Sequence, residues 1–168
     1  MTATTGREPE ARRGALVIGY GNTLRSDDGA GPFVARALEA RVPAGTRILD
    51  AHQLTPEMAI DISVATRVVF VDAIDVTRGL ARRESAPQES GPRVSRLEPE
   101  PGADPLNPHA SDPGSLLWLA KTLFGGAPEA WLVAIPGTEF GFGETLSPGT
   151  ARASADAIAQ VEALLART

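Results

Sequence analysis

The sequence predicts a three-layer α/β domain, in which helices flank a mainly parallel central sheet. Two observations lead to this prediction. Short apolar runs with the length and β-branched content of buried strands alternate along the chain with segments that are apolar at helical spacing. The run at 67–74, RVVFVDAI, is almost continuously apolar, which is typical of a strand covered on both faces in the middle of a parallel sheet.

Turn and capping residues place the individual elements. Thr55-Pro56 and Asp112-Pro113 each predict a helix start, because a capping oxygen followed by proline suits the N-cap and the first helical position. Gly125-Gly126 ends the second of these helices. Its expected apolar face consists of Leu116, Leu117, Ala120, Leu123 and Phe124. Strands are expected near 15–20, 46–51, 67–72 and 130–135, with an antiparallel edge strand near 93–98.

Composition sets limits on size, compartment and partners. The chain has 168 residues, of which 42% are hydrophobic and 22% charged, as in ordinary soluble single domains. We expect a polar, disordered tail at 1–13 and one domain at 14–168. The net charge of −5 argues against nucleic-acid and anionic-membrane partners, and no apolar run is long enough to span a bilayer. The absence of cysteine excludes disulfides, thiolate metal sites and cysteine nucleophiles. It also fits the cytoplasm, where we expect a monomer.

The glycine-rich segment 19–32, GYGNTLRSDDGAGP, lies between the first expected strand and the first expected helix. Three interpretations compete for it. Its acidic residues can cap the helix. Its glycines can form a dinucleotide loop, although Leu24 stands where the third glycine belongs and two acids would face a pyrophosphate. Alternatively, Asp27 and Asp28 belong to a carboxylate site at the carboxyl edge of the sheet, where open α/β sheets bind ligands.

Few reactive side chains lie at the expected strand ends. Asp28, Asp72 and His109 can converge there, because the carboxyl ends of parallel strands share one edge. Two carboxylates and an imidazole suit a borderline divalent ion, which could polarise a carbonyl or activate water. Each residue also has a simpler interpretation. Asp72 can be a turn former, His109 can be structural or exposed, and His52 can orient a neighbour. The sequence lacks G-x-S-x-G, H-E-x-x-H and a phosphate loop.

Three motifs follow one another along nearly the whole chain. They are Gly19-x-Gly21-Asn22-x-Leu24-x-x-Asp27-Asp28-Gly29-x-Gly31, then Val71-Asp72-Ala73 after an apolar strand, and then Pro108-His109. In this order and spacing they resemble the motifs of the nickel–iron hydrogenase maturation proteases. The resemblance implies a phosphorylase/hydrolase-like fold. It also implies an endopeptidase that removes the C-terminal extension of a hydrogenase large-subunit precursor once nickel has been inserted.

The resemblance also implies a site. The nickel-recognising positions of the family fall on Asp28, Asp72 and His109, with Asp28 replacing the glutamate of some members. We expect Asn22, Asp27, His52 and Gln53 to bind substrate. The nickel would arrive with the precursor, held by its thiolates, and no organic cofactor is expected. The attacking water would be activated by Asp28 or Asp72, or would be bound to the metal. The segments HQLTPE (52–57) and FGFGE (140–144) resemble the branch that serves cytoplasmic, multisubunit hydrogenases.

Two other functions remain open on the sequence alone. The same three ligands would serve a non-catalytic, nickel-dependent assembly factor that grips the precursor without cutting it. An α/β nucleotide-binding module would be favoured if the glycine-rich loop has the shape of a phosphate cradle.

Overall fold

The computed structural model describes residues 13–77, 91–101 and 112–167. These residues form, in chain order, β1 (Arg13–Tyr20), η1 (Ser26–Gly29), α1 (Ala30–Leu38), β2 (Arg47–Ala51), α2 (Met58–Val64), β3 (Ala65–Asp75), β4 (Arg93–Leu97), α4 (Pro113–Phe124), β5 (Glu129–Gly137) and α5 (Pro148–Leu165). The expected tail at 1–13 falls outside this range except for Arg13, which begins β1. Within the described residues, no helix has the length and apolar content needed to cross a bilayer.

The five described strands form one sheet in the order β2-β1-β3-β5-β4. The first three pairings are parallel, and β4 runs antiparallel to β5. This arrangement confirms the predicted mainly parallel sheet with an antiparallel edge strand. β3 lies at the centre of the sheet and continues to Asp75. Asp72 therefore lies within this strand and not at its end, three residues short of its last residue.

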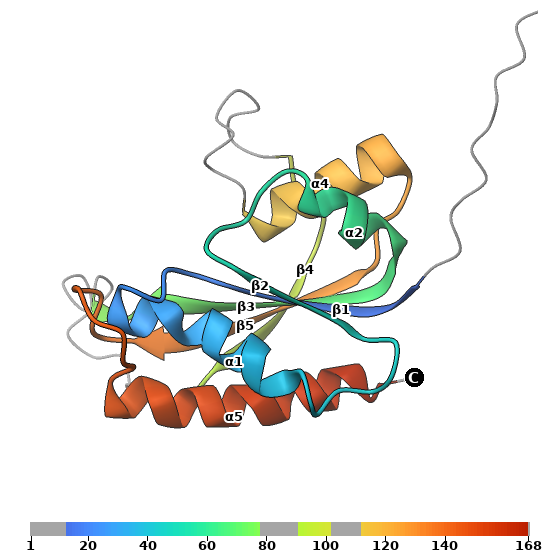
Figure 1. Cartoon of the computed structure of the whole chain (residues 1–168). Helices are drawn as coiled ribbons and strands as arrows, with labels where there is room; N and C mark the ends of the chain where they lie inside the picture. Colours follow the sequence, from blue (N-terminus) through green and yellow to red (C-terminus); the bar gives the residue numbers. More distant parts are fainter. Residues whose placement is uncertain (1–12, 78–90, 102–111, 168) are drawn as a thin grey trace, which may run out of the picture.

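Helices cover both faces of the sheet, as the three-layer prediction requires (Figure 1). Helices α2 and α4 pack on one face and α1 and α5 on the other, and each face has its own buried core (Figure 1). Side chains alternate along a strand, so successive β3 residues enter different cores. Phe70 belongs to the α2/α4 core, and Val71 to the α1/α5 core. Asp72 consequently faces the same side of the sheet as Phe70.

The helix starts agree with the sequence in one case and differ in the other. Asp112 caps α4 as predicted, and its carboxylate and the Ser115 hydroxyl form a reciprocal capping box. α2, however, begins at Met58, and Thr55 only accepts a hydrogen bond from the Met58 N–H in the preceding turn. The predicted apolar face of α4 is also too long, because Leu123 and Phe124 are 63% and 46% exposed.

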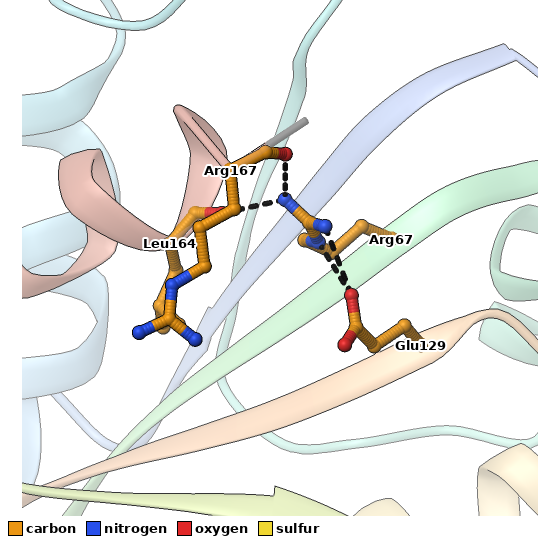
Figure 2. Close-up of polar contacts among 4 residues, drawn as sticks. All are labelled: Arg67, Glu129, Leu164 and Arg167. Atoms are coloured by element: carbon orange, nitrogen blue, oxygen red, sulfur yellow. Dashed lines mark hydrogen bonds and ion pairs between the residues drawn. The ribbon is translucent and has the colours of Figure 1, made fainter.

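The amino ends of β3 and β5 are tied to the end of α5 by one arginine (Figure 2). The Arg67 guanidinium forms a salt bridge of 2.9 Å with Glu129. It also donates hydrogen bonds of 2.6 Å to the backbone oxygens of Leu164 and Arg167, where helical carbonyls lack intrahelical partners. The Arg167 guanidinium lies 5.4 Å from the centre of the Trp131 ring, at a distance suited to a cation–π contact. These contacts fix the end of the sheet that lies opposite the glycine-rich loop.

Candidate carboxylate site

The glycine-rich loop turns sharply at the carboxyl end of β1 because two positions have no side chain. Gly21 has a φ of 140°, which glycine adopts readily, and its N–H donates to the Ala51 carbonyl at the end of β2. A Cβ at Gly31 would collide with the carbonyl oxygens of Tyr20 and Val71. The start of α1 therefore packs directly on the backbones of β1 and β3. This packing brings η1, which carries Asp28, close to Asp72.

Asp28 is partly exposed, and its carboxylate binds the backbone of an earlier residue in the same loop. Its Oδ2 accepts a hydrogen bond of 3.1 Å from the Asn22 N–H, and the Asn22 side-chain oxygen accepts one of 2.9 Å from the Leu24 N–H. Neither η1 nor α1 has a side-chain cap, so the interpretation of these acids as helix caps is wrong. Asn22, expected to bind substrate, uses its side-chain oxygen to shape the loop.

Asp72 is a largely buried carboxyl group beside Tyr20. In the parallel register, Gly19 of β1 pairs with Val71 of β3, so the next residues, Tyr20 and Asp72, are neighbours on adjacent strands. Burial raises the pKa of Asp72 to about 6, a hydrogen bond from the Tyr20 hydroxyl and another from the Ala73 backbone oppose the rise, and the Asp28 charge adds to it. The carboxyl group thus exchanges its proton near neutral pH and lies within reach of the charge of Asp28.

Tyr20 shares this environment. Burial raises the pKa of the Tyr20 phenol, and the negative charges of Asp72 and Asp112 raise it further. The phenol is consequently a hydrogen-bond donor at every physiological pH. The influence of Asp112 also shows that the amino end of α4 faces this part of the sheet.

Asp27 is fully buried, and its carboxylate faces away from solvent. Its oxygens accept hydrogen bonds of 2.7–2.9 Å from the backbone N–H groups of Thr138, Glu139 and Ser147 and from the Ser147 hydroxyl. Burial acts to raise the pKa of Asp27, but these hydrogen bonds outweigh it and lower the pKa. Asp27, which we expect to bind substrate, thus directs its acceptor positions at the β5–α5 loop.

The segment 138–147, which connects β5 to α5, is attached to the glycine-rich loop at further points. Gly143 donates its N–H to the Leu24 carbonyl, and its own carbonyl accepts from the Ser26 N–H at 2.8 Å. The Arg25 guanidinium donates two hydrogen bonds of 3.1 and 3.2 Å to the Phe140 carbonyl. Together with Asp27, these contacts join the two loops into one unit.

The other sequence-predicted site residues are His52, Gln53 and His109. His52 and Gln53 follow β2 and are exposed. His109 lies outside the described residues, three positions before Asp112. Among the residues that the structure does describe, no three His, Cys, Asp or Glu side chains are grouped so as to hold a metal ion. Asp28 and Asp72 are near enough for the Asp28 charge to raise the pKa of Asp72, and we refer to them as the carboxylate pair.

Sequence reasoning missed Tyr20 and the β5–α5 loop. Tyr20 stands between two glycines of the motif, and the sequence assigned it no role. The only signal was the register: Tyr20, the last residue of β1, becomes the neighbour of Asp72, late in β3, once the two strands pair in parallel. Ser147 had no signal at all, because it lies 120 positions from Asp27 in the sequence.

The fold and the site define a class: an α/β domain with a carboxylate pair at the carboxyl edge of a parallel sheet. Neither a family model nor a curated protein matches the sequence. Several solved structures, however, are similar to this chain. The hydrogenase maturating endopeptidase HybD from E. coli is 25% identical with a TM-score of 0.70, and the alignment covers 90% of this chain and 91% of that one.

Two archaeal structures are similar as well. The nickel–iron hydrogenase maturation protease HycI from Thermococcus kodakarensis is 19% identical with a TM-score of 0.66, covering 93% and 94% of the two chains. The hydrogenase 2 maturation peptidase from a Thaumarchaeota archaeon is 24% identical with a TM-score of 0.62, covering 90% and 97%. These similarities extend over nearly the whole chain and agree with the resemblance that its motifs indicated, and they support a peptidase role in hydrogenase maturation.

Proposed function

We propose that this protein removes the C-terminal extension of a nickel–iron hydrogenase large-subunit precursor after nickel has been inserted. The observation that carries the proposal is the pairing of Asp28 with Asp72, which differ in environment. Asp28 is partly exposed on a short loop, whereas Asp72 is largely buried and has a pKa near 6. Pairs of carboxyl groups in unequal environments are typical of acid–base sites.

Asp72 suits the general base of peptide hydrolysis. A catalytic base works best when its pKa lies near the working pH, and burial brings Asp72 close to that condition. In the proposed step, the carboxylate takes a proton from water while the water oxygen bonds to the scissile carbonyl carbon. The carboxyl group then returns the proton to the leaving amine as the peptide C–N bond breaks. The Tyr20 hydrogen bond holds the carboxylate in place throughout.

Nickel enters this proposal as part of the substrate. Precursor thiolates would supply most of its ligands, while Asp28, Asp72 and His109 would complete the set. His109 is included on the strength of the motif resemblance alone. Two carboxylates without a cation repel one another, so a precursor lacking nickel would dock poorly. We propose that the protein acts in the cytoplasm as a monomer and needs no organic cofactor.

A crossed incubation tests both the cleavage and the source of the metal. Enzyme treated with a chelator, which is then removed, is mixed with nickel-loaded precursor, and nickel-treated enzyme is mixed with nickel-free precursor. Mass spectrometry measures the loss of the C-terminal extension. The proposal expects cleavage only in the first mixture, because the two carboxylates provide no thiolate and hold nickel weakly without the precursor.

The other outcomes are informative. Cleavage only in the second mixture would make the carboxylates part of a resident metal site. A stable complex with the loaded precursor but no cleavage would identify a non-catalytic assembly factor. Asp156→Asn, which changes an exposed acid on α5, is the matched control for Asp72→Asn in the same assay.

A further inference from the structure

The glycine-rich loop, the β5–α5 loop and α1 each display one large apolar side chain to solvent. Phe142 is 98% exposed, Leu24 is 53% exposed, and Phe33 in α1 is 47% exposed. Single exposed hydrophobic residues are ordinary. An almost fully exposed aromatic ring, however, leaves a large apolar surface in contact with water. Exposed apolar clusters of this kind mark binding surfaces.

Leu24 and Phe142 lie side by side. Arg25 and Gly143 form an isolated parallel β-bridge, through the hydrogen bonds from Gly143 to Leu24 and from Ser26 to Gly143. The residue before each bridge partner is therefore Leu24 on one strand and Phe142 on the other. These two side chains form a projection, which we call the Leu24/Phe142 knob.

The backbone that carries the knob is anchored at several points. The buried carboxylate of Asp27 accepts hydrogen bonds from both ends of the β5–α5 loop, at Thr138 and at Ser147, and Arg25 fixes the Phe140 carbonyl between them. An anchored backbone lowers the entropy cost of binding, and exposed aromatic side chains are the usual anchors of protein interfaces. The loop thus presents Phe142 ready for a partner.

A hollow of about 360 Å³ lies next to the knob. Ser26 and Glu144, close neighbours in sequence of Leu24 and Phe142, form part of its wall, and Phe33, Ala37 and Leu146 form its apolar lining. Gly29, the residue after Asp28, lines it too. Because two peptide units span at most about 7 Å, Leu24 also lies close to Asn22, whose N–H binds the Asp28 carboxylate. The knob and the hollow thus adjoin the loop that carries Asp28.

We propose that the knob and the adjoining hollow dock onto the folded body of the precursor and direct its tail to the carboxylate pair. This inference rests on the proposed function. The occupant is a folded domain, because a metal held by several thiolates requires a chain already folded around it. A projection beside a hollow also matches a shaped protein surface better than an extended tail, which would have to lie at Asp72. The residues concerned determine binding of the precursor and take no part in bond cleavage.

The test uses the nickel-loaded large-subunit precursor from the organism's own hydrogenase. Phe142→Ala and Leu24→Ala are compared with Phe124→Ala and Leu123→Ala, which remove similar exposed side chains from the far end of α4. We expect each knob variant to raise both the Kd for the precursor and the KM about tenfold or more, with kcat and the melting temperature unchanged. Phe142→Leu should restore part of the affinity, and the α4 variants should behave like the wild type.

Measuring Kd and cleavage separately distinguishes the two proposals. If the wild type cleaves and the knob variants bind normally, the docking surface is overturned and the proposed function stands. If the wild type binds without cleaving and the knob variants bind weakly, the docking surface stands and the peptidase function fails. A wild type that neither binds nor cleaves the loaded precursor overturns both.

Discussion

The Tyr20 hydroxyl donates a hydrogen bond to the Asp72 carboxylate across the junction of β1 and β3. Burial and this hydrogen bond have opposing effects on the pKa of Asp72. Burial raises the pKa of Asp72 to about 6, and the hydrogen bond from Tyr20 limits that rise. A carboxyl group that changes its protonation state near neutral pH is suited to proton transfer but is costly to keep ionised, which leads to the first prediction.

Asp72→Asn should abolish processing and increase stability at high pH. Asn keeps the size of the side chain and can still accept the Tyr20 hydrogen bond, but it has no charge and cannot take a proton. Loss of a general base lowers the rate about 100-fold or more. The melting temperature at pH 8 should rise by a few degrees, since 1 kcal/mol corresponds to about 2–4 °C in a protein of this size. Mass spectrometry and calorimetry measure the two effects.

The pH dependence of this stabilisation follows from the sign of the shift. The folded protein binds the Asp72 proton more tightly than the unfolded chain does, so the stabilising contribution of that proton is complete below about pH 4. It is lost as the pH rises through about 6. The melting temperatures of the wild type and Asp72→Asn should therefore converge near pH 4 and diverge toward pH 8. A constant difference across this range would contradict the assignment, and Asp156→Asn serves as the control.

Asp27→Ala should destabilise the protein and impair processing. The substitution leaves the N–H groups of Thr138, Glu139 and Ser147 without their acceptor. Hydrogen bonds to a charged group contribute about 1.5–3 kcal/mol each, so a loss of about 3 kcal/mol or more is expected. Ser147→Ala removes only the hydroxyl and should cost less. Denaturant unfolding at pH 7 gives both values, and equal losses would argue against the role assigned to Asp27.

The Asp27 contribution should depend on pH in the opposite direction from that of Asp72. Its pKa is lowered in the folded protein, so its stabilising effect is present above the unfolded pKa of about 3.9 and is lost as the pH falls through the folded value. Asp27→Asn, which keeps one acceptor oxygen, should therefore differ most from the wild type near pH 7 and least in strong acid. Unfolding curves measured from pH 7 to pH 2 follow this convergence.

Gly31→Ala should disrupt the carboxylate site without changing any charged group. The added methyl group would collide with the backbone oxygens of Tyr20 and Val71, and it would push η1 and Asp28 away from β3. Both the melting temperature and the processing rate should fall. Gly149→Ala is the matched control, because a Cβ there meets nothing within 4 Å and alanine favours the helix by about 0.5–1 kcal/mol. Normal activity in Gly31→Ala would refute this account of the loop.

The sequence by itself determined the sheet, its parallel pairs and its edge strand, because uninterrupted apolar runs such as 68–71 have few alternatives to burial in a central strand. It also indicated Asp28 and Asp72 through their motifs. The resemblance gave Asp27 and Asp28 different roles, but only the tertiary structure showed how their surroundings differ. The two residues are identical and adjacent, yet the turn of η1 directs one carboxylate into the β5–α5 loop and leaves the other near Asp72. Tyr20 acquired its partner only through the strand register. Contacts between residues 50 to 120 positions apart depend on how the chain packs. Local sequence patterns do not predict that packing.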